Sequence, residues 1–144
     1  MKAKYLVIFI VTFFIAQPFS AQEVYLSPSE YPEEINEYVA KHFSAFEIVS
    51  IKQDKEPLKT EYEVQLNNQV ELEFDGKFVI KKIEGKTSLP ASVIPQQIQD
   101  YVSQNYPSNF IIEWKKEGNN QEVELDNDLD LVFDLNGKFL RIDD

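Results

Sequence analysis

The sequence contains no cysteine, and its 144 residues include one histidine, one methionine, one tryptophan and four glycines. Without cysteine, no disulfide framework and no lipid-modified cysteine is available, so an ordinary apolar core must stabilise the chain. Metal sites built from His and Cys are excluded because their ligands are missing. A nucleophilic triad would have to use His42, for which the sequence supplies no positioned partner. We therefore expect a structural, partly buried His42 and no enzyme activity.

Basic residues are also scarce. The chain has 14 Lys and Arg against 25 Asp and Glu, and its net charge at pH 7 is −11. The acid excess is spread over both halves instead of forming a tail. A field of this sign repels nucleic acid and anionic lipid headgroups, and it favours basic protein surfaces or cations. We expect a protein partner with a basic surface, and no nucleic acid.

The start of the chain has the layout of a secretory signal peptide. Lys2 and Lys4 precede an apolar run over 5–16, and small residues follow up to Ala21. The run is well short of the roughly 20 residues that cross a bilayer as a helix, so retention as a membrane anchor is the weaker alternative. We expect cleavage after Ala21, a periplasmic or secreted protein, and no membrane insertion after cleavage.

The most informative feature is that the second half of the chain repeats the first. The pattern Tyr31-Pro32-x-x-Ile35-x-x-Tyr38-Val39 recurs 63 residues later as Ile94-Pro95-x-x-Ile98-x-x-Tyr101-Val102. Downstream, Glu63-Val64-Gln65-Leu66 matches Glu122-Val123-Glu124-Leu125, and Phe74-Asp75-Gly76-Lys77-Phe78 matches Phe133-Asp134 with Gly137-Lys138-Phe139. A fixed period indicates that one supersecondary unit is used twice. We place the signal peptide at 1–21, the first unit at 22–86 and the second at 87–144, with both units sharing a core or a continuous sheet.

Each unit is expected to begin with a short amphipathic helix. Apolar residues at i, i+3, i+4, i+7 and i+8 predict helices over 32–44 and 95–106. Pro32 and Pro95 would occupy the first helical position, where proline is tolerated.

The rest of each unit alternates apolar and polar residues with a period of two, which predicts strands with one buried and one wet face. We expect strands over 46–52, 62–66, 70–74 and 78–80 in the first unit, with a polar loop over 53–60. The second unit would have strands over 110–117, 121–125, 129–134 and 138–142, after a linker at 84–89. The predicted fold class is α+β, with two tandem repeats that each pack a short helix on a four-stranded antiparallel meander.

These helix, strand and hairpin motifs resemble the secreted PepSY-like proteins, whose fold is similar to that of the beta-lactamase inhibitor protein. The resemblance covers nearly the whole chain after the signal peptide. It implies that the helices pack on one face of the sheet and that the other, concave face grips a partner protein. The expected function is an exported, non-enzymatic binding module of inhibitor-like type, with no cofactor.

The candidate partner-binding residues are polar side chains that alternate with the core positions and therefore should lie opposite the helices. They are Glu63, Gln65, Glu71, Glu73, Glu122, Glu124 and Asp130. Trp114 is added because it aligns with Ser50 in the first unit, so the repeat itself does not require an aromatic residue there. Phe110 and Ile112 share the parity of Trp114, however, so core packing is the leading interpretation of this residue and a binding role is the alternative.

A second possible function is a periplasmic ligand- or cation-binding protein that uses acidic hairpins. Asp126-Asn127-Asp128-Leu129-Asp130 begins like a calcium loop, but the sixth and twelfth positions are Leu131 and Gly137, where an EF-hand needs Gly and Glu. A solvated turn is therefore the stronger prediction for this segment, and no metal site is assigned.

Overall fold

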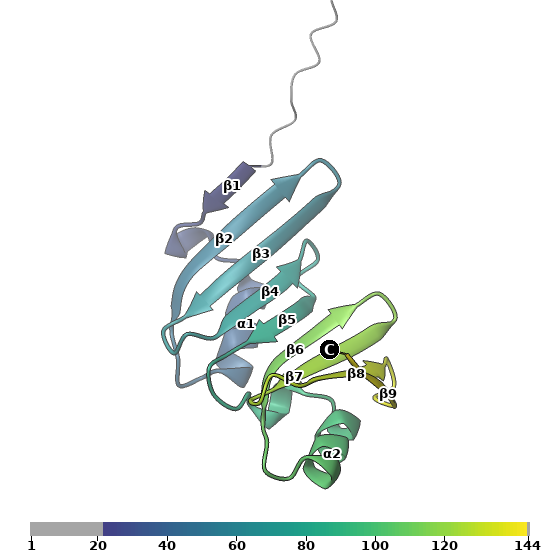
Figure 1. Ribbon diagram of the computed structural model, residues 1–144. Helices are drawn as coiled ribbons and strands as arrows, with labels where there is room; N and C mark the ends of the chain where they lie inside the picture. Colours follow the sequence, from purple (N-terminus) through teal and green to yellow (C-terminus); the bar gives the residue numbers. More distant parts are fainter. Residues whose placement is uncertain (1–21, 144) are drawn as a thin grey trace, which may run out of the picture.

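The computed structural model describes residues 22–143, so the predicted signal peptide lies outside the described residues. Nine strands form a single antiparallel sheet in which strands follow one another in chain order (Figure 1). The strands are β1 Gln22–Tyr25, β2 Ile48–Glu56, β3 Lys59–Leu66, β4 Glu71–Asp75, β5 Ile80–Glu84, β6 Ile111–Glu117, β7 Asn120–Leu125, β8 Asp130–Asp134 and β9 Phe139–Asp143. The helices are α1 Glu33–His42 and α2 Gln96–Asn105, and a 3-10 turn precedes each of them at Pro28–Glu30 and Ala91–Val93.

The two units form one continuous sheet, which is one of the two arrangements expected, and this sheet has one strand more than the two predicted four-stranded meanders. β1, which the sequence reading missed, pairs with β2 at one edge. β5 pairs with β4 on one side and with β6 on the other, so it joins the two units. α1 thus follows β1, which pairs with β2, and α2 follows β5, which pairs with β6.

The predicted loop over 53–60 is wrong, because β2 and β3 extend through most of it and meet at a tight turn. Gln53 and Asp54 are half-buried, and the strand ends beyond them are mostly polar and exposed, so the apolar alternation that marks a half-buried strand fades there. Similarly, β5 runs through Glu84, where a linker was expected.

The two helices form where the apolar spacing predicted them, but each begins one residue later than expected. Pro32 and Pro95 are N-cap residues with extended backbone angles, so both lie just outside the first turn. In α1 the buried side chains are Ile35 and Val39, and in α2 they are Ile98 and Val102. Neither helix in the described part of the chain has the length and apolarity needed to cross a membrane.

One core lies between the helices and one face of the sheet. Val64, Leu72, Leu125 and Leu131 are fully buried or nearly so, as the strand alternation predicted. Tyr38 of α1 meets Phe74 edge-on at 5.3 Å between ring centroids, and Tyr101 of α2 repeats the arrangement with Phe133 at 5.4 Å. The two units thus bury their helices in the same way.

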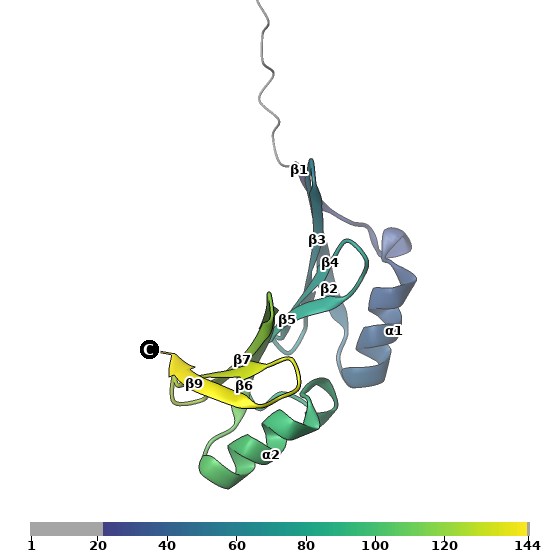
Figure 2. The same cartoon turned by 90° about the vertical axis from the view of Figure 1, so that its right-hand side faces the viewer.

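The sheet bends between the two units. In Figure 2 the β1–β4 limb and the β6–β9 limb meet at an angle, with α1 and α2 on the outer side of the bend. The face without helices is therefore the inner, concave face.

Candidate functional site: an acidic concave face

The concave face carries side chains in rows that run across the sheet, because directly opposite residues of neighbouring strands point to the same side. One row consists almost entirely of carboxylates. Its members, in strand order from β3 to β9, are Gln65, Glu71, Glu84, Glu113, Glu124, Asp130 and Asp143. The neighbouring row mixes charges, and its members from β1 to β9 are Tyr25, Lys52, Glu63, Glu73, Lys82, Lys115, Glu122, Val132 and Arg141. We call these the acidic row and the mixed row.

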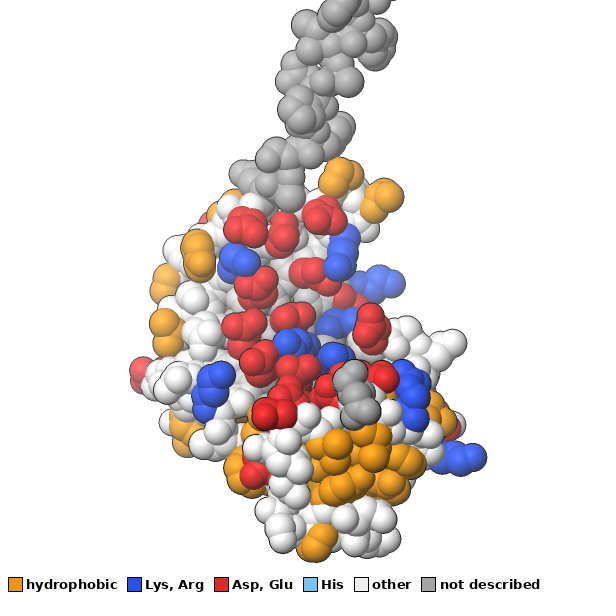
Figure 3. Space-filling view, viewed as in Figure 1, with side chains coloured by type: hydrophobic (Ala, Val, Ile, Leu, Met, Phe, Trp, Pro, Cys, Tyr) orange, Lys and Arg blue, Asp and Glu red, His pale blue; other side chains and the backbone are white. Residues whose placement is uncertain are grey.

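All predicted site residues except Trp114 lie in these two rows. Figure 3 shows the result as a strip of acidic side chains across the face, with Lys and Arg side chains among them. Glu84, Glu113 and Asp143 complete the acidic row and were not among the predicted site residues. Glu84 was assigned to the linker, the last predicted strand ended one residue before Asp143, and Glu113 lies opposite Glu84 only because β5 pairs with β6, which the repeat did not reveal.

Lysines of the mixed row neutralise part of the acidic row. Lys82 Nζ lies 2.8 Å from Glu84 Oε2 and 3.2 Å from Glu113 Oε2. Lys115 Nζ lies 4.0 Å from Glu113 Oε1 of the acidic row and 2.6 Å from Glu122 Oε1, which belongs to the mixed row itself. Burial lowers the pKa of the Lys82 ammonium, but its hydrogen bonds and ion pairs with the two glutamates outweigh that effect and raise it above its ordinary value.

Other acids of the two rows have no basic side chain within ion-pair distance among residues 22–143, namely Glu71, Glu73, Glu124 and Asp130. Burial and neighbouring carboxylates raise the pKa of Glu73, Glu124 and Asp130. Glu124 lies directly opposite Glu113 on β6 and Asp130 on β8. The concave face therefore holds negative charge that is only partly compensated, and a cationic group on a partner would relieve it.

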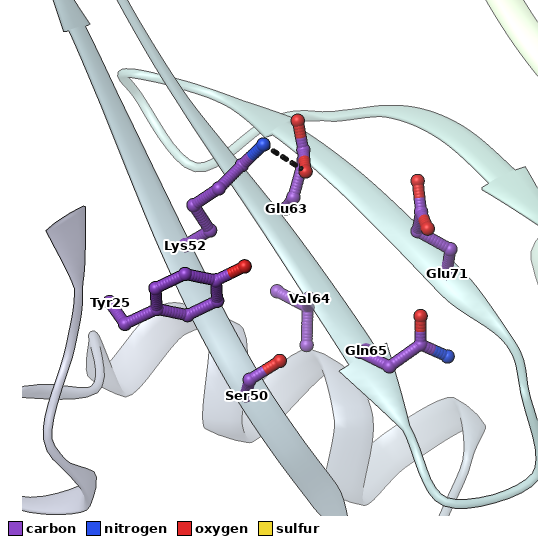
Figure 4. A pocket seen from close by; sticks show the side chains of 7 residues that line it. All are labelled: Tyr25, Ser50, Lys52, Glu63, Val64, Gln65 and Glu71. Atoms are coloured by element: carbon purple, nitrogen blue, oxygen red, sulfur yellow. Dashed lines mark ion pairs between the residues drawn. The ribbon is translucent and has the colours of Figure 1, made fainter. Parts of the chain in front are cut away.

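A hollow of about 190 Å³ lies on this face at the first unit. Figure 4 shows Lys52 between Glu63 and the ring of Tyr25, with Gln65 and Glu71 on the adjoining strands. Lys52 Nζ lies 2.7 Å from Glu63 Oε2. The Tyr25 side chain is 71% exposed, so the hollow presents an aromatic ring beside carboxylates. Tyr25 was missed because β1 was missed, although Val24 and Tyr25 are residue types that favour strands.

Trp114 does not belong to the concave face. It is 6% exposed, lies opposite Ile83 and Val123, and packs in the core. The alignment with Ser50 is wrong by one residue. Each unit has a β-bulge at the same place, between Ile48 and Ser50 and between Ile111 and Glu113, so the bulges are 63 residues apart, as the helix motifs are. The same offset places Trp114 at the position of the buried Ile51.

The segment that resembled the start of a calcium loop is a hairpin turn. The Asp126 carboxylate accepts hydrogen bonds from the Asn109 amide at 2.9 Å and from the Phe110 backbone N–H at 3.1 Å. These hydrogen bonds lower the pKa of Asp126. Among residues 22–143, no group of three or more Asp, Glu or His side chains is arranged to hold a metal ion.

His42 has a structural contact. Its Nδ1 lies 3.0 Å from Ser92 Oγ, so it links α1 of the first unit to the 3-10 turn of the second. The pKa of the imidazole is lowered, mainly by burial and to a smaller extent by the nearby positive charge of Lys41.

Three solved structures resemble this fold closely. A protein from Bacteroides vulgatus, described as "a putative periplasmic protein of unknown function", is 31% identical, with a TM-score of 0.80 over 85% of this chain and 100% of the other. A protein from Bacteroides thetaiotaomicron, described as "a putative calcium-regulated periplasmic protein", is 30% identical, with a TM-score of 0.79 over 85% and 97% of the two chains. A second Bacteroides vulgatus protein, of the DUF2874 family, shares the fold at 24% identity and a TM-score of 0.77, over 85% and 97% of the two chains.

No protein of curated function matches the sequence. A family model matches it twice, over residues 18–82 and again over 81–141, and the family is described as "Putative beta-lactamase-inhibitor-like, PepSY-like". The chain therefore belongs to the PepSY-like, beta-lactamase-inhibitor-like family and contains two copies of its unit.

Proposed function

We propose that this protein is a periplasmic, non-enzymatic binding module that engages a basic protein through its concave face. The observation that carries the proposal is the acidic row, in which carboxylates of neighbouring strands lie directly opposite one another. Like charges opposite one another destabilise a sheet, so a surface that keeps them is better explained by a ligand that pairs with them. The periplasmic descriptions of relatives at 31% and 30% identity support the location.

The shape of the face supports a protein partner more than a small molecule. The bend of the sheet leaves a broad concave surface, and the hollow beside Lys52 has a volume of about 190 Å³ and is lined mainly by polar side chains (Figures 2 and 4). Pockets for small ligands are usually larger, about 300–1,000 Å³, and mostly apolar. Tyr25 supplies an exposed aromatic ring of the kind that often anchors a protein interface.

The proposal can be tested with the protein as bait in the periplasmic fraction of its native host. A captured basic protein should associate more slowly with a variant in which Glu71, Glu73, Glu122 and Glu124 are replaced by Gln. Raising the salt concentration should slow association with the wild-type protein, because the screening length falls from about 10 Å at 0.1 M to about 3 Å at 1 M.

The matched control has the same change in charge on the helices. Its substitutions are Glu33→Gln, Glu34→Gln, Glu37→Gln and Asp100→Asn, all at exposed positions of α1 and α2. This variant should associate with the partner much faster than the variant of the concave face. Equal association rates for the two variants would show that only net charge matters and would remove the concave face as the site.

A calcium response is the second candidate function. It is favoured by the description of the relative at 30% identity as calcium-regulated and by the uncompensated acids Glu124 and Asp130, whose pKa values are raised. Calcium binds six to eight oxygen ligands, so neighbouring carboxylates would have to turn toward a shared ion. Titration calorimetry with calcium chloride, compared with magnesium chloride, tests this. Calcium-selective heat that disappears in a Glu124→Gln and Asp130→Asn double variant would support it, and no heat would refute it.

A further inference from the structure

β9 lies at one edge of the sheet, whereas its counterpart in the first unit, β5, is paired on both sides. β5 is the last strand of the first meander, as β9 is of the second, and β6 pairs with the outer edge of β5. Ile83 of β5 is consequently fully buried, whereas its counterpart Ile142 of β9 is 46% exposed. Leu140, which occupies the bulge of β9, is 45% exposed.

Apolar surface continues from this edge toward α2. The rings of Tyr101 and Phe139 are stacked at 4.6 Å between centroids, and both side chains are only partly buried. Figure 3 shows apolar side chains gathered below the acidic strip, in the region of β8, β9 and α2. In the first unit the corresponding flank is covered, because β6 pairs with β5 and Ser92 contacts His42.

The charges on β9 select one register for a partner strand. Arg141 and Asp143 flank Ile142 on the concave side, where Arg141 belongs to the mixed row and Asp143 to the acidic row. In an antiparallel pair of two β9 strands with Ile142 opposite Ile142, Arg141 of each copy lies opposite Asp143 of the other. A shift by two residues in one direction would place Arg141 opposite Arg141, and in the other direction Asp143 opposite Asp143.

We propose that β9 pairs with β9 of a second copy of this chain, antiparallel across a twofold axis, with Ile142 at the centre. The pairing closes both free β9 edges, and it buries the two Ile142 side chains against each other on the helix side. It gives two Arg141–Asp143 pairs between the copies instead of the pair within each strand, in which Arg141 Nη2 lies 2.8 Å from Asp143 Oδ2. Because the interface is isologous, assembly stops at the dimer.

Sedimentation velocity on the protein purified from the periplasm of its host tests the proposal. The wild-type protein should convert from monomer to dimer as its concentration rises. Arg141→Asp alone, or Asp143→Arg alone, should weaken dimerisation at least about tenfold, because each places like charges opposite one another. The two substitutions together should restore it, since each copy again offers opposite charges in the same register.

The β1 edge supplies the control. Val24→Lys on β1 should leave dimerisation unchanged, whereas Ile142→Lys on β9 should abolish it; the two side chains are 39% and 46% exposed. A protein that stays monomeric up to about 1 mM would overturn the proposal. The proposal would also be overturned if the double variant dimerised no more tightly than either single variant. Loss of assembly in Val24→Lys, or species larger than a dimer, would show that β9 pairs with β1 of another copy instead. None of these results depends on a basic partner, so they are separate from the test of the concave face.

Discussion

Trp114 donates a hydrogen bond from its indole Nε1 to Oε1 of Gln121, 3.0 Å away inside the core. Gln121 is 5% exposed, and its Nε2 donates to the Asp134 carbonyl at 3.1 Å. In the first unit the same two positions hold Ile51 and Tyr62. In the second unit the larger side chain, Trp114, is at the first of these positions, and in the first unit the larger one, Tyr62, is at the second. The combined volume of the two side chains is therefore similar in both units.

Replacing Trp114 by Phe should lower the free energy of unfolding by about 1–3 kcal/mol, because the buried Oε1 of Gln121 loses its donor. Urea unfolding measures the change. In a Gln121→Met background the same substitution should cost less, since no buried acceptor is then left unpaired. Equal costs in the two backgrounds would mean that the hydrogen bond does not contribute.

Replacing Glu124 by Gln should stabilise the fold at pH 7 by about 0.2–1 kcal/mol, because it removes a carboxylate that lies opposite Glu113 and Asp130. The pKa of Glu124 is raised in the folded protein, so the folded state holds this proton more tightly than the unfolded state does. Ionised Glu124 is therefore unfavourable above its folded pKa. The advantage of the variant should shrink as the pH is lowered from 7 through that pKa, and an advantage that is independent of pH would contradict this explanation.

His42 should show the opposite pH dependence. The folded pKa of its imidazole is lowered, so its contribution to stability is fully present above the unfolded pKa of about 6.5 and is lost as the pH falls toward the folded pKa. His42→Asn, which introduces the residue found at the equivalent position 105, should cost about 0.5–1.5 kcal/mol at pH 7 and less at about pH 5. Thermal unfolding of both proteins across this range checks it. Ser92→Ala should remove most of the difference between them if the contact with Ser92 is responsible.

The isoleucines at the ends of the two meanders offer a matched pair. Ile83→Ala should cost about 2–5 kcal/mol because the side chain is fully buried beneath the junction of the units. Ile142→Ala should cost less than about 1 kcal/mol in dilute protein, since that side chain is nearly half exposed. Similar costs would mean that the junction of the two units contributes no more than a free sheet edge.

The sequence predicted the helices, the core face and most of the concave face, because these depend on periods within single elements. Ile35 and Val39 follow the helical spacing, and the alternation of Glu71 with Leu72 assigns each residue to its face. It did not predict features that depend on pairing between distant strands. Glu113 and Asp143 could be assigned to the acidic row only from the pairing of β6 with β5 and of β9 with β8. The alternation also changes at the bulge between Ile111 and Glu113, so the side to which Phe110 and Ile112 point could not be used to place Trp114.

Because β5 ends the first meander and pairs directly with β6, the first strand of the second, the structural period of this chain is one helix and four strands, and β1 is left over as a ninth strand. It lies against β2 where β5 lies against β6. β1 therefore covers the edge of β2 in the same way as the last strand of the first unit covers the edge of β6. A chain with a third unit would need no new kind of joint, only another helix and four strands inserted after β9 or before β2.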